Sequence, residues 1–265
     1  MHIAIETLTW SDIEVVGRDK KAIGLVPLGA LEQHGPHLPL GTDTLITRRL
    51  AEALSESLNA PVVVTPTIDV GLSDHHTAFP GTVTIEAGTY GRLVSAYIDG
   101  LRSAGLTQVG VFSHHGGNFK LMTSLANDYR SAAVTGFAVA AYDNLSRYLT
   151  IEQEAVRFAG GIVSDADAHA GLVETSLMLH LAGDLCRDHR SIGGYEPTDD
   201  AWLERVMNDG IQTVSPTGVL GSPAGATEAI GCAIFMALTS ELATWLESAF
   251  LIPASNASTS TGTTA

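Results

Sequence analysis

The sequence predicts an α/β fold built on a mainly parallel sheet with helices over both faces. Three observations predict it: four short apolar runs rich in Val and Ile, amphipathic segments between them, and the length of those connections. Parallel neighbours cannot be joined by a tight turn, so strands that alternate with helices imply crossover connections. Continuous apolar runs are typical of strands that are buried on both faces.

The predicted strands are bounded by turn residues and cover 22–29 (AIGLVPLG), 61–66 (PVVVTP), 108–114 (QVGVFSH) and 136–142 (GFAVAAY). Apolar residues recur at helical spacing between and after them. The three clearest stripes are Ile46, Leu50, Leu54 and Leu58; Tyr90, Leu93, Val94, Tyr97, Ile98 and Leu101; and Ile230, Ile234, Leu238, Leu242 and Trp245. The last stripe predicts a long C-terminal helix.

The chain is expected to form one domain over residues 1–252, because no repeat or linker divides it. The remainder, 253–265 (PASNASTSTGTTA), is small and polar without apolar periodicity, which predicts a disordered tail. With 45% hydrophobic and 16% charged residues, a chain of 265 residues can bury a substantial core.

Composition excludes several classes of partner. The 14 basic and 29 acidic residues give a formal charge of −15, which repels nucleic acid and anionic membrane surfaces. Cys186 and Cys232 are the only cysteines and lie far apart, so neither a disulfide framework nor a thiolate zinc site is indicated. No export signal or membrane span is recognisable, so we expect a cytoplasmic protein.

Polar clusters follow the predicted strands. The segment GALEQHGPHLPLGTD (29–43) follows the first strand, and SHHGGN (113–118) follows the third. Both leave the same edge of a parallel sheet, where ligands bind in such folds. A third cluster, DADAHAGLVETS (165–176), brings His169 and Glu174 to the start of a predicted helix. We expect the three segments to converge on one site.

Spacing within these clusters suits metal ions. Glu32 and His34, two residues apart in an extended segment, project to the same side and can reach one centre. Asp43 follows at the start of a helix, where a carboxylate is favoured. Carboxylates and imidazoles without cysteine suit zinc, manganese or iron. More than four such groups favour a pair of cations over a single one.

Simpler structural roles remain open for each residue. Asp43 alone is a typical helix cap, Gly116 and Gly117 can permit a tight turn, and His37 or His75 can act as hydrogen-bonded loop residues. A metal site is nevertheless favoured, because many histidines gather in only four loop segments. These are His34, His37, His75, His76, His114, His115 and His169. From composition and spacing, a metal hydrolase and a set of structural polar residues stay as alternatives.

Five segments in order resemble the signatures of the creatininase, or creatinine amidohydrolase, family. They are PLGALEQHGPHLPLGTD (27–43), GLSDHHTAFPGT (71–82), SHHGGN (113–118), HAGLVETS (169–176) and GVLGSPAGAT (218–227). Any one of them is a weak signal, whereas the ordered set is specific. The resemblance implies a three-layer α/β/α hydrolase with two divalent ions (zinc, manganese or iron) per subunit. It also implies a homohexamer built as a trimer of dimers.

The resemblance assigns metal ligands residue by residue. Glu32, His34, Asp43 and His115 match family ligands, with Asp43 in the bridging role. Creatininase has a Tyr and a Glu directly after the last of these histidines, where this chain has two glycines. The second metal therefore lacks one ligand, and we expect Glu174 to supply it.

The resemblance also implies the reaction. Two cations would activate a shared water against a carbonyl carbon, and His169 matches the catalytic histidine, which passes a proton to the leaving nitrogen. Residues expected to bind substrate or support the ligands are His76, Gly116, Gly117, Asn118 and Asp167.

The substrate is less defined. The creatinine-specific enzyme carries a Trp-Asp pair shortly before its catalytic histidine, whereas residues 164–168 here read SDADA, which argues against creatinine. We expect a small-molecule substrate, a cyclic or formyl amide whose C–N bond is cleaved. Alternatives are a peptidase that trims a modified precursor peptide of the mycofactocin type, and ring opening of a cyclic keto-sugar. A non-catalytic metal-binding oligomer is a further alternative, against which His169 argues. Trp202, on a segment expected to be mobile, is a candidate lid residue.

Overall fold

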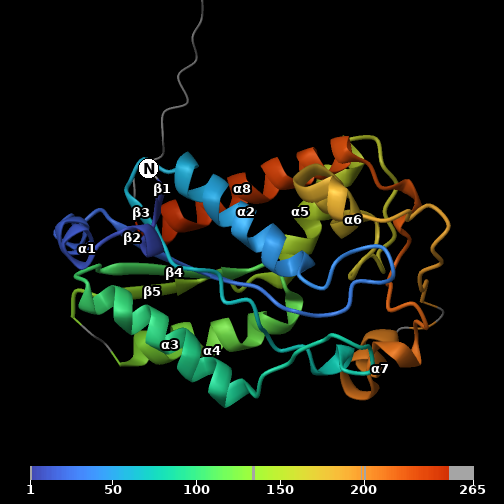
Figure 1. Cartoon of the computed structure of the whole chain (residues 1–265), viewed down its shortest axis with the longest axis horizontal. Coiled ribbons are helices and arrows are strands. Elements are labelled where there is room, and N and C mark those ends of the chain that lie inside the picture. The colour runs from blue at the N-terminus through green and yellow to red at the C-terminus, as the bar shows by residue number, and fades with distance from the viewer. Residues whose placement is uncertain (1, 133–134, 198, 200, 251–265) are drawn as a thin grey trace, which may run out of the picture.

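The computed structural model describes residues 2–132, 135–197, 199 and 201–250 (Figure 1). Its centre is one parallel sheet of strand order β1-β3-β2-β4-β5. The strands are β1 (His2–Ala4), β2 (Ile23–Leu28), β3 (Val62–Val64), β4 (Gln108–Ser113) and β5 (Ala138–Ala141). Four of them lie within the predicted runs. The edge strand β1 was not predicted, because three half-buried residues carry too short a pattern.

Helices cover both faces of the sheet. Figure 1 shows α2, α5, α6 and α8 on one side and α3 and α4 on the other, which confirms the predicted three-layer α/β/α fold. The α-helices are α1 (Trp10–Gly17), α2 (Thr42–Ser57), α3 (Ala87–Ser103), α4 (Phe119–Ser131), α5 (Leu145–Phe158), α6 (Leu172–Ala182), α7 (Trp202–Asp209) and α8 (Glu228–Phe250). Short 3₁₀ turns are η1 (Ile5–Thr7), η2 (Asp74–His76), η3 (Gly116–Asn118), η4 (Gly183–Leu185), η5 (Ile211–Thr213) and η6 (Pro223–Gly225).

The C-terminal helix α8 belongs to the protein core. Among the described residues it is the one helix with the length and apolar composition of a membrane span. Its predicted stripe is buried at Ile230, Ile234, Leu238 and Leu242 and partly buried at Trp245, and the helix packs against α2, α5 and α6. This burial accounts for the apolar residues on the inner face of the helix. The predicted domain boundary at 252 and the tail at 253–265 lie outside the described residues.

The ends of β2 and β4 lie side by side. Leu28 pairs with Ser113 in the parallel register, so the segments after both strands leave the sheet at one point. Thr47 of α2 joins them: its hydroxyl donates to the Leu28 carbonyl (3.3 Å) and accepts from the His114 amide (3.1 Å). The sheet and α2 together therefore bring the first and third polar segments to one place.

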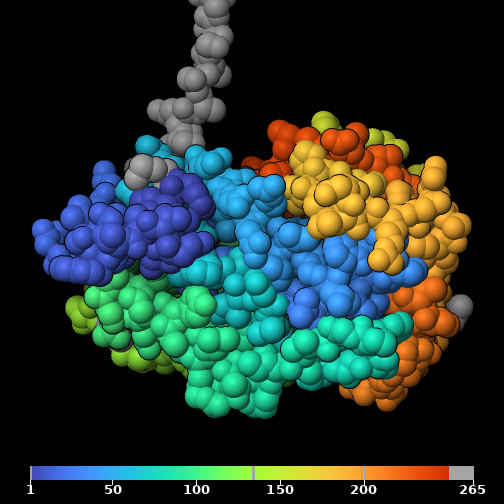
Figure 2. Space-filling model, viewed as in Figure 1, coloured from blue at the N-terminus to red at the C-terminus, as the bar shows by residue number. Residues whose placement is uncertain are grey.

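Helix α7 stands apart from the main core. It packs beside η2 and η5, and Figure 2 shows its orange surface next to the teal residues around position 75. A separate small apolar cluster holds it, in which Val206, Ile211 and Leu220 are buried. The segment around Trp202, expected to be a mobile lid, thus contains an ordered helix.

Candidate metal centre

The segment after β2 buries two predicted ligands completely. Glu32 and His34 both have an exposed fraction of 0%. The Glu32 amide donates to the Leu40 carbonyl (3.0 Å), which closes the loop. Gly35 lies in the left-handed region (φ 65°), where glycine is favoured, and lets the chain turn directly after His34. The loop thus aims two side chains inward at a defined angle.

Asp43 is directed into the same place. Gly41 precedes α2 as its cap residue, and no side chain caps this helix end. The Asp43 carboxylate instead faces His34 Nε2 (3.6 Å) and His115 Nδ1 (3.5 Å). It lies between the two histidines rather than capping the helix.

Helix α6 delivers Glu174 to the other side of this group. Glu174 Oε2 lies 3.7 Å from His34 Nε2, and Glu174 Oε1 lies 3.4 Å from His114 Nε2. The structure therefore brings together Glu32, His34, Asp43, His115 and Glu174, as the sequence predicted. It adds His114, which had no assigned role.

The polar atoms of this cluster fit a resident cation. Buried atoms without a hydrogen-bond partner are Glu32 Oε1 and Oε2, His34 Nε2, Asp43 Oδ2 and His114 Nε2. Unpaired buried carboxylates and imidazoles are costly, whereas shared divalent cations would satisfy them. Two groups with ligand atoms within 4.8 Å of one another share Asp43: Glu32, Asp43 and His115, and Asp43, His114 and Glu174. The donor set, all oxygen and nitrogen, suits zinc, manganese or iron.

Two histidines are held in the tautomer that a metal ligand needs. His34 Nδ1 donates to the Glu32 carbonyl (3.1 Å), which leaves Nε2 free to face Asp43 and Glu174. His115 Nε2 donates to the Leu72 carbonyl (3.1 Å), which leaves Nδ1 facing Glu32 and Asp43. An outward hydrogen bond from one ring nitrogen is the usual support of a ligating histidine.

Burial and mutual charge shift the titration of these groups. Burial is the largest effect at Glu32 and raises its pKa to about 7. Burial opposes charge at His34 also, but the carboxylates of Asp43 and Glu174 outweigh it and raise the pKa of His34 well above its ordinary value. At Glu174 burial is likewise outweighed, by His34, and the pKa lies well below its ordinary value. Without a cation, His34 therefore tends to bind a proton between the two carboxylates, and a bound cation would replace that proton.

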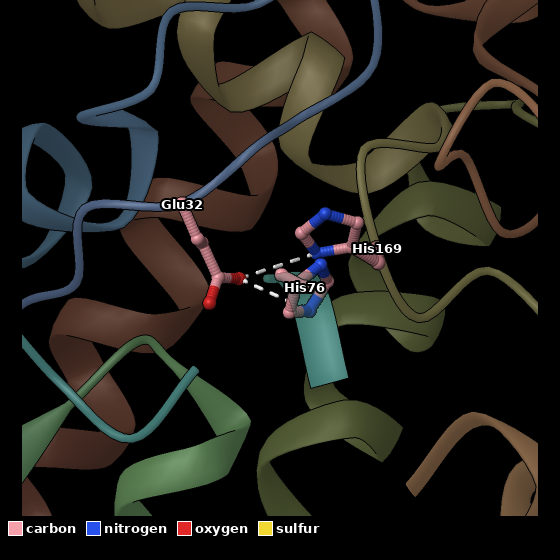
Figure 3. Close-up of side chains that lie close together, drawn as sticks. All are labelled: Glu32, His76 and His169. Carbon is pink, nitrogen blue, oxygen red and sulfur yellow. Dashed lines mark ion pairs between the residues drawn. The ribbon is translucent and has the colours of Figure 1, made fainter. Parts of the chain in front are cut away.

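A second triad adjoins the cluster (Figure 3). His76 Nε2 and His169 Nδ1 point at Glu32 Oε1, at 3.4 and 3.6 Å. Gln33 orders both rings: its side-chain nitrogen donates to His76 Nδ1 (2.9 Å), and its backbone carbonyl accepts from His169 Nε2 (2.7 Å). His76 therefore carries its proton on Nε2, which lies 3.4 Å from Glu32 Oε1. His169 keeps its Nδ1 lone pair directed at the cluster.

The backbone around His169 is unusual. Ala170 is the one non-glycine among the described residues with a positive φ (52°), a conformation that persists where the surroundings enforce it. Its amide donates to Glu174 Oε2. Asp167 accepts from the amides of Leu172 (2.7 Å) and Val173 (3.1 Å) at the start of α6. Asp167 thus fixes the helix that carries Glu174.

The two glycines after His115 have different surroundings. A Cβ at Gly117 would collide with the Leu72 carbonyl and the His115 ring, whereas a Cβ at Gly116 would meet open space in the cavity. A glutamate at 117 would displace the His115 support, which explains physically why a carboxylate reaches the cluster from α6 instead. Neither glycine has a positive φ, so a tight turn is not the reason for them.

The remaining predicted residues lie around the cluster. Asn118 donates to the Gly29 carbonyl (3.0 Å) and accepts from the Leu72 amide (3.2 Å), so it joins three loops. His37 bonds the Thr175 hydroxyl (2.8 Å) and lies outside the candidate metal groups. His75 lines the cavity beside His115.

A cavity of about 390 Å³ opens above the cluster. Its floor contains Glu32, Asp43, His115, His169 and Glu174. Its wall is mainly apolar and comes from α5, α6, α7 and the segments after α7, with Leu145, Leu149, Val173, Trp202, Leu203, Val206, Met207, Ile211 and Leu220. The arrangement can hold an apolar group beside a polar reaction centre.

Sequence reasoning missed four residues of this site. Gln33, His114, Tyr148 and Glu152 act through partners that are distant in sequence, for example Gln33 and His169, 136 residues apart. The doubled histidine of SHHGGN was the one available signal for His114. Tyr148 and Glu152 lie in the middle of a helix without any motif.

Comparison with known proteins shows which family the chain belongs to. The family model "Creatininase: Creatinine amidohydrolase" matches residues 6–246. A mycofactocin precursor peptide peptidase of Mycolicibacterium smegmatis is 37% identical over 217 residues, which cover 80% of this chain and 78% of that protein. A creatinine amidohydrolase of Pseudomonas putida is 26% identical over 195 residues, which cover 69% and 73%.

Solved structures share the fold. A creatinine amidohydrolase (creatininase) crystal structure superposes with a TM-score of 0.76 at 23% identity, covering 94% of this chain and 98% of that chain. A creatininase named as a Mn form and a mutant creatininase named as a Zn-Zn type have TM-scores of 0.74 and 0.72 at 22% identity. Each covers 94% of this chain and 99% of its own.

Proposed function

The chain belongs to the creatininase family of hydrolases, and we propose that it is a two-metal peptidase that trims a modified precursor peptide. Two findings favour a peptide over a small amide. The greater sequence identity is to a peptidase, 37% against 26% for the creatinine enzyme. The cavity wall also continues outward along α7, where Leu203 and Met207 are about half exposed.

We assign the two cations to groups that share Asp43. Glu32, Asp43 and His115 would hold one, and His34, Asp43 and Glu174 the other. Zinc, manganese and iron all accept these donors. When bound, such ions lower the pKa of water towards neutrality and polarise a carbonyl oxygen. The orphaned buried atoms of Glu32, His34 and Asp43 support this assignment.

His169 is the proposed catalytic residue. Its Nε2 proton is committed to the Gln33 carbonyl, so its Nδ1 lone pair is the atom available to reactants. Burial, together with the charge on His34, lowers the pKa of His169 to about 3, which keeps the ring neutral. A neutral ring can accept the proton of the attacking water and then donate it to the leaving nitrogen. His76 would hold Glu32 in place meanwhile.

The apolar wall is the observation that carries the choice of substrate. Next to the polar floor, apolar side chains of α7 and α5 line the space that a substrate group on one side of the scissile bond would occupy. A peptide with a large apolar side chain at that position would bury it there. A formamide or a creatinine molecule has no comparable apolar surface.

A small cyclic or formyl amide is the second candidate substrate. The cavity volume, about 390 Å³, lies near the lower end of the range for ligand pockets, which favours a small molecule. The SDADA segment has no aromatic side chain to cover creatinine, so creatinine itself is the weakest member of this class.

An activity screen on metal-loaded protein separates the candidates. The substrates are short peptides with an apolar or a charged residue beside one bond, together with creatinine, lactams, formamides and a cyclic keto-sugar. Cleavage of the apolar peptides alone supports the proposal, and turnover of small amides alone replaces it with the second candidate. A His169→Gln variant serves as the inactive control. Metal-loaded protein that is inert towards every compound would indicate a non-catalytic binding protein.

We also propose that the protein is a cytoplasmic homohexamer that binds no nucleic acid and no membrane. The family resemblance supports the assembly, and the formal charge of −15 supports the absence of polyanionic partners. Light scattering coupled to size exclusion tests the mass directly, and a mass other than six subunits would contradict the assembly.

A further inference from the structure

His114 has a ring whose two nitrogens face different surroundings. The side chain is buried, and its Nε2 has no hydrogen-bond partner. That atom lies 3.4 Å from Glu174 Oε1, and Asp43, His114 and Glu174 offer three atoms within 4.8 Å of one another. The ring thus presents a free nitrogen to two carboxylates assigned above to the second cation.

The opposite nitrogen is supported by α5. His114 Nδ1 lies 3.0 Å from the Tyr148 hydroxyl oxygen and 3.8 Å from Glu152 Oε1. Tyr148 and Glu152 are themselves buried. The Tyr148 hydroxyl oxygen can accept a hydrogen bond from a protonated Nδ1, which leaves the Nε2 lone pair free. A carboxylate, a histidine and a metal in line is the usual support of a ligating imidazole.

The same pattern occurs at His34 and His115. Each has one nitrogen bonded outward, to the Glu32 and Leu72 carbonyls, and the other directed at the carboxylates. His76 lacks it, because its Nδ1 accepts a hydrogen bond from the Gln33 side chain and its protonated Nε2 faces Glu32 Oε1 at 3.4 Å. His169 shares the pattern, with Nε2 bonded to the Gln33 carbonyl and Nδ1 directed at Glu32, so the pattern is a requirement for a ligand and does not identify one by itself.

We propose that His114 is a further ligand of the second cation, held by Tyr148 and Glu152. This inference rests on the two-metal site of the proposed function. A tetrahedral site with bonds of about 2.0–2.2 Å places its ligand atoms roughly 3.3–3.6 Å apart. The separation of Glu174 Oε1 from His114 Nε2 (3.4 Å) lies within that range, and the separation of Glu174 Oε2 from His34 Nε2 (3.7 Å) lies just above it. The second cation then has four protein ligands, His34, Asp43, His114 and Glu174.

Such a ligand would explain how the chain tolerates Gly117. Glu174 restores the missing carboxylate but approaches from a separate helix, through a side chain that is 12% exposed. The imidazole of His114, directly after β4, would bind the cation from the side of the sheet and would thereby keep Glu174 in place.

The test is metal binding by His114→Gln. Glutamine can still donate a hydrogen bond to Glu174 but is a poor ligand, so it separates coordination from positioning. The matched control is His180→Gln, since His180 lies on the same helix as Glu174 and faces Phe235. Each protein is loaded with Co²⁺, and the bound ions are counted by elemental analysis and competition with a chelator.

We expect wild type and the control to bind two Co²⁺ ions. In His114→Gln the affinity for one ion should fall by more than the roughly 10- to 100-fold that is typical when only a residue supporting a ligand is lost. The proton NMR spectrum of the Co²⁺ protein should also lose one hyperfine-shifted, exchangeable imidazole N–H signal, that of His114 Nδ1. Circular dichroism confirms folding of the variant, and Tyr148→Phe should weaken the same ion to a smaller extent.

The outcomes separate the two proposals. Unchanged affinity and an unchanged number of shifted signals in His114→Gln would overturn the ligand role while leaving the two-metal site intact. A wild-type protein that binds no Co²⁺ would instead remove the proposed function together with this inference. Weaker binding with no signal lost would show that His114 only positions Glu174, which also overturns the ligand role.

Discussion

The floor and the wall of the cavity differ in burial, in polarity and in how they are anchored to the rest of the protein. On the floor, Glu32 is fully buried, Asp43 is 1% exposed and His115 is 4% exposed, and each faces charged side chains of the cluster. On the wall, Leu203 and Met207 of α7 are 52% and 55% exposed. The floor holds charges that need one geometry, whereas the wall offers apolar surface that tolerates change. We therefore expect chemistry and specificity to be carried by different parts of the fold.

The two regions are also anchored differently. The floor lies where β2, β4, α2 and α6 meet, within the main core. The wall helix α7 has eight residues and rests on a small separate cluster around Val206, Ile211 and Leu220. Regions with few buried apolar contacts open at lower free energy. Substitutions on the floor should alter metal binding and turnover, and substitutions on the wall should alter the choice of substrate.

Asp43→Ala should have the largest effect. It removes the carboxylate that both metal groups share, so we expect loss of at least one ion and of hydrolysis, with the fold retained. Elemental analysis and circular dichroism measure the two together. Full metal content in a folded Asp43→Ala protein would mean that this carboxylate bridges nothing.

His169→Gln should retain the metals and lose turnover. Because His169 is proposed to move a proton rather than to bind a cation, kcat should fall by roughly 10²- to 10⁴-fold while the ion content stays at the wild-type value. Steady-state kinetics beside elemental analysis tests this. A fall in metal content equal to the fall in kcat would place His169 among the ligands.

Leu203→Asp tests the wall. A charge on the apolar surface should raise KM for apolar peptides by roughly tenfold and leave metal content unchanged. Leu185→Asp is the matched control, since Leu185 is 47% exposed in η4 and lies outside the cavity. Equal effects of the two variants on KM would contradict a role of α7 in substrate binding.

Ala170→Gly should have the smallest effect. Glycine relieves the left-handed strain of an L-residue, about 1 kcal/mol, and loses a similar amount through its greater freedom when unfolded. The backbone amide that donates to Glu174 is kept. We expect a thermal midpoint within a few degrees of wild type and unchanged metal content; a large loss of metal would show that the alanine side chain itself matters.

Local pattern was sufficient for much of the fold. Four of the five strands and the stripe of α8 follow from apolar periodicity, because a buried strand or helix face must be apolar along its length. The helices α1, α4 and α5 were not assigned from the sequence, and neither were the strand β1 and the helix α7, whose three and eight residues with partial burial carry weak periodicity. The side on which Glu32 and His34 emerge also follows from the period of two in an extended chain.

By itself, then, the sequence determined the parallel sheet, the edge at which its polar segments gather, and the common direction in which Glu32 and His34 project from their segment. Only the tertiary structure decided that Gln33 orders His76 and His169, that Gly117 leaves no room for a side chain, and that His114 turns a free nitrogen to Glu174. Chain geometry sets direction over two or three residues, but contacts between residues tens of positions apart depend on how whole helices pack. For that reason the proposed ligands Glu32 and His34, carried by one loop, could be predicted from their spacing. Glu174 of α6 was expected only from the family resemblance, and His114, which contacts α5, had no assigned role.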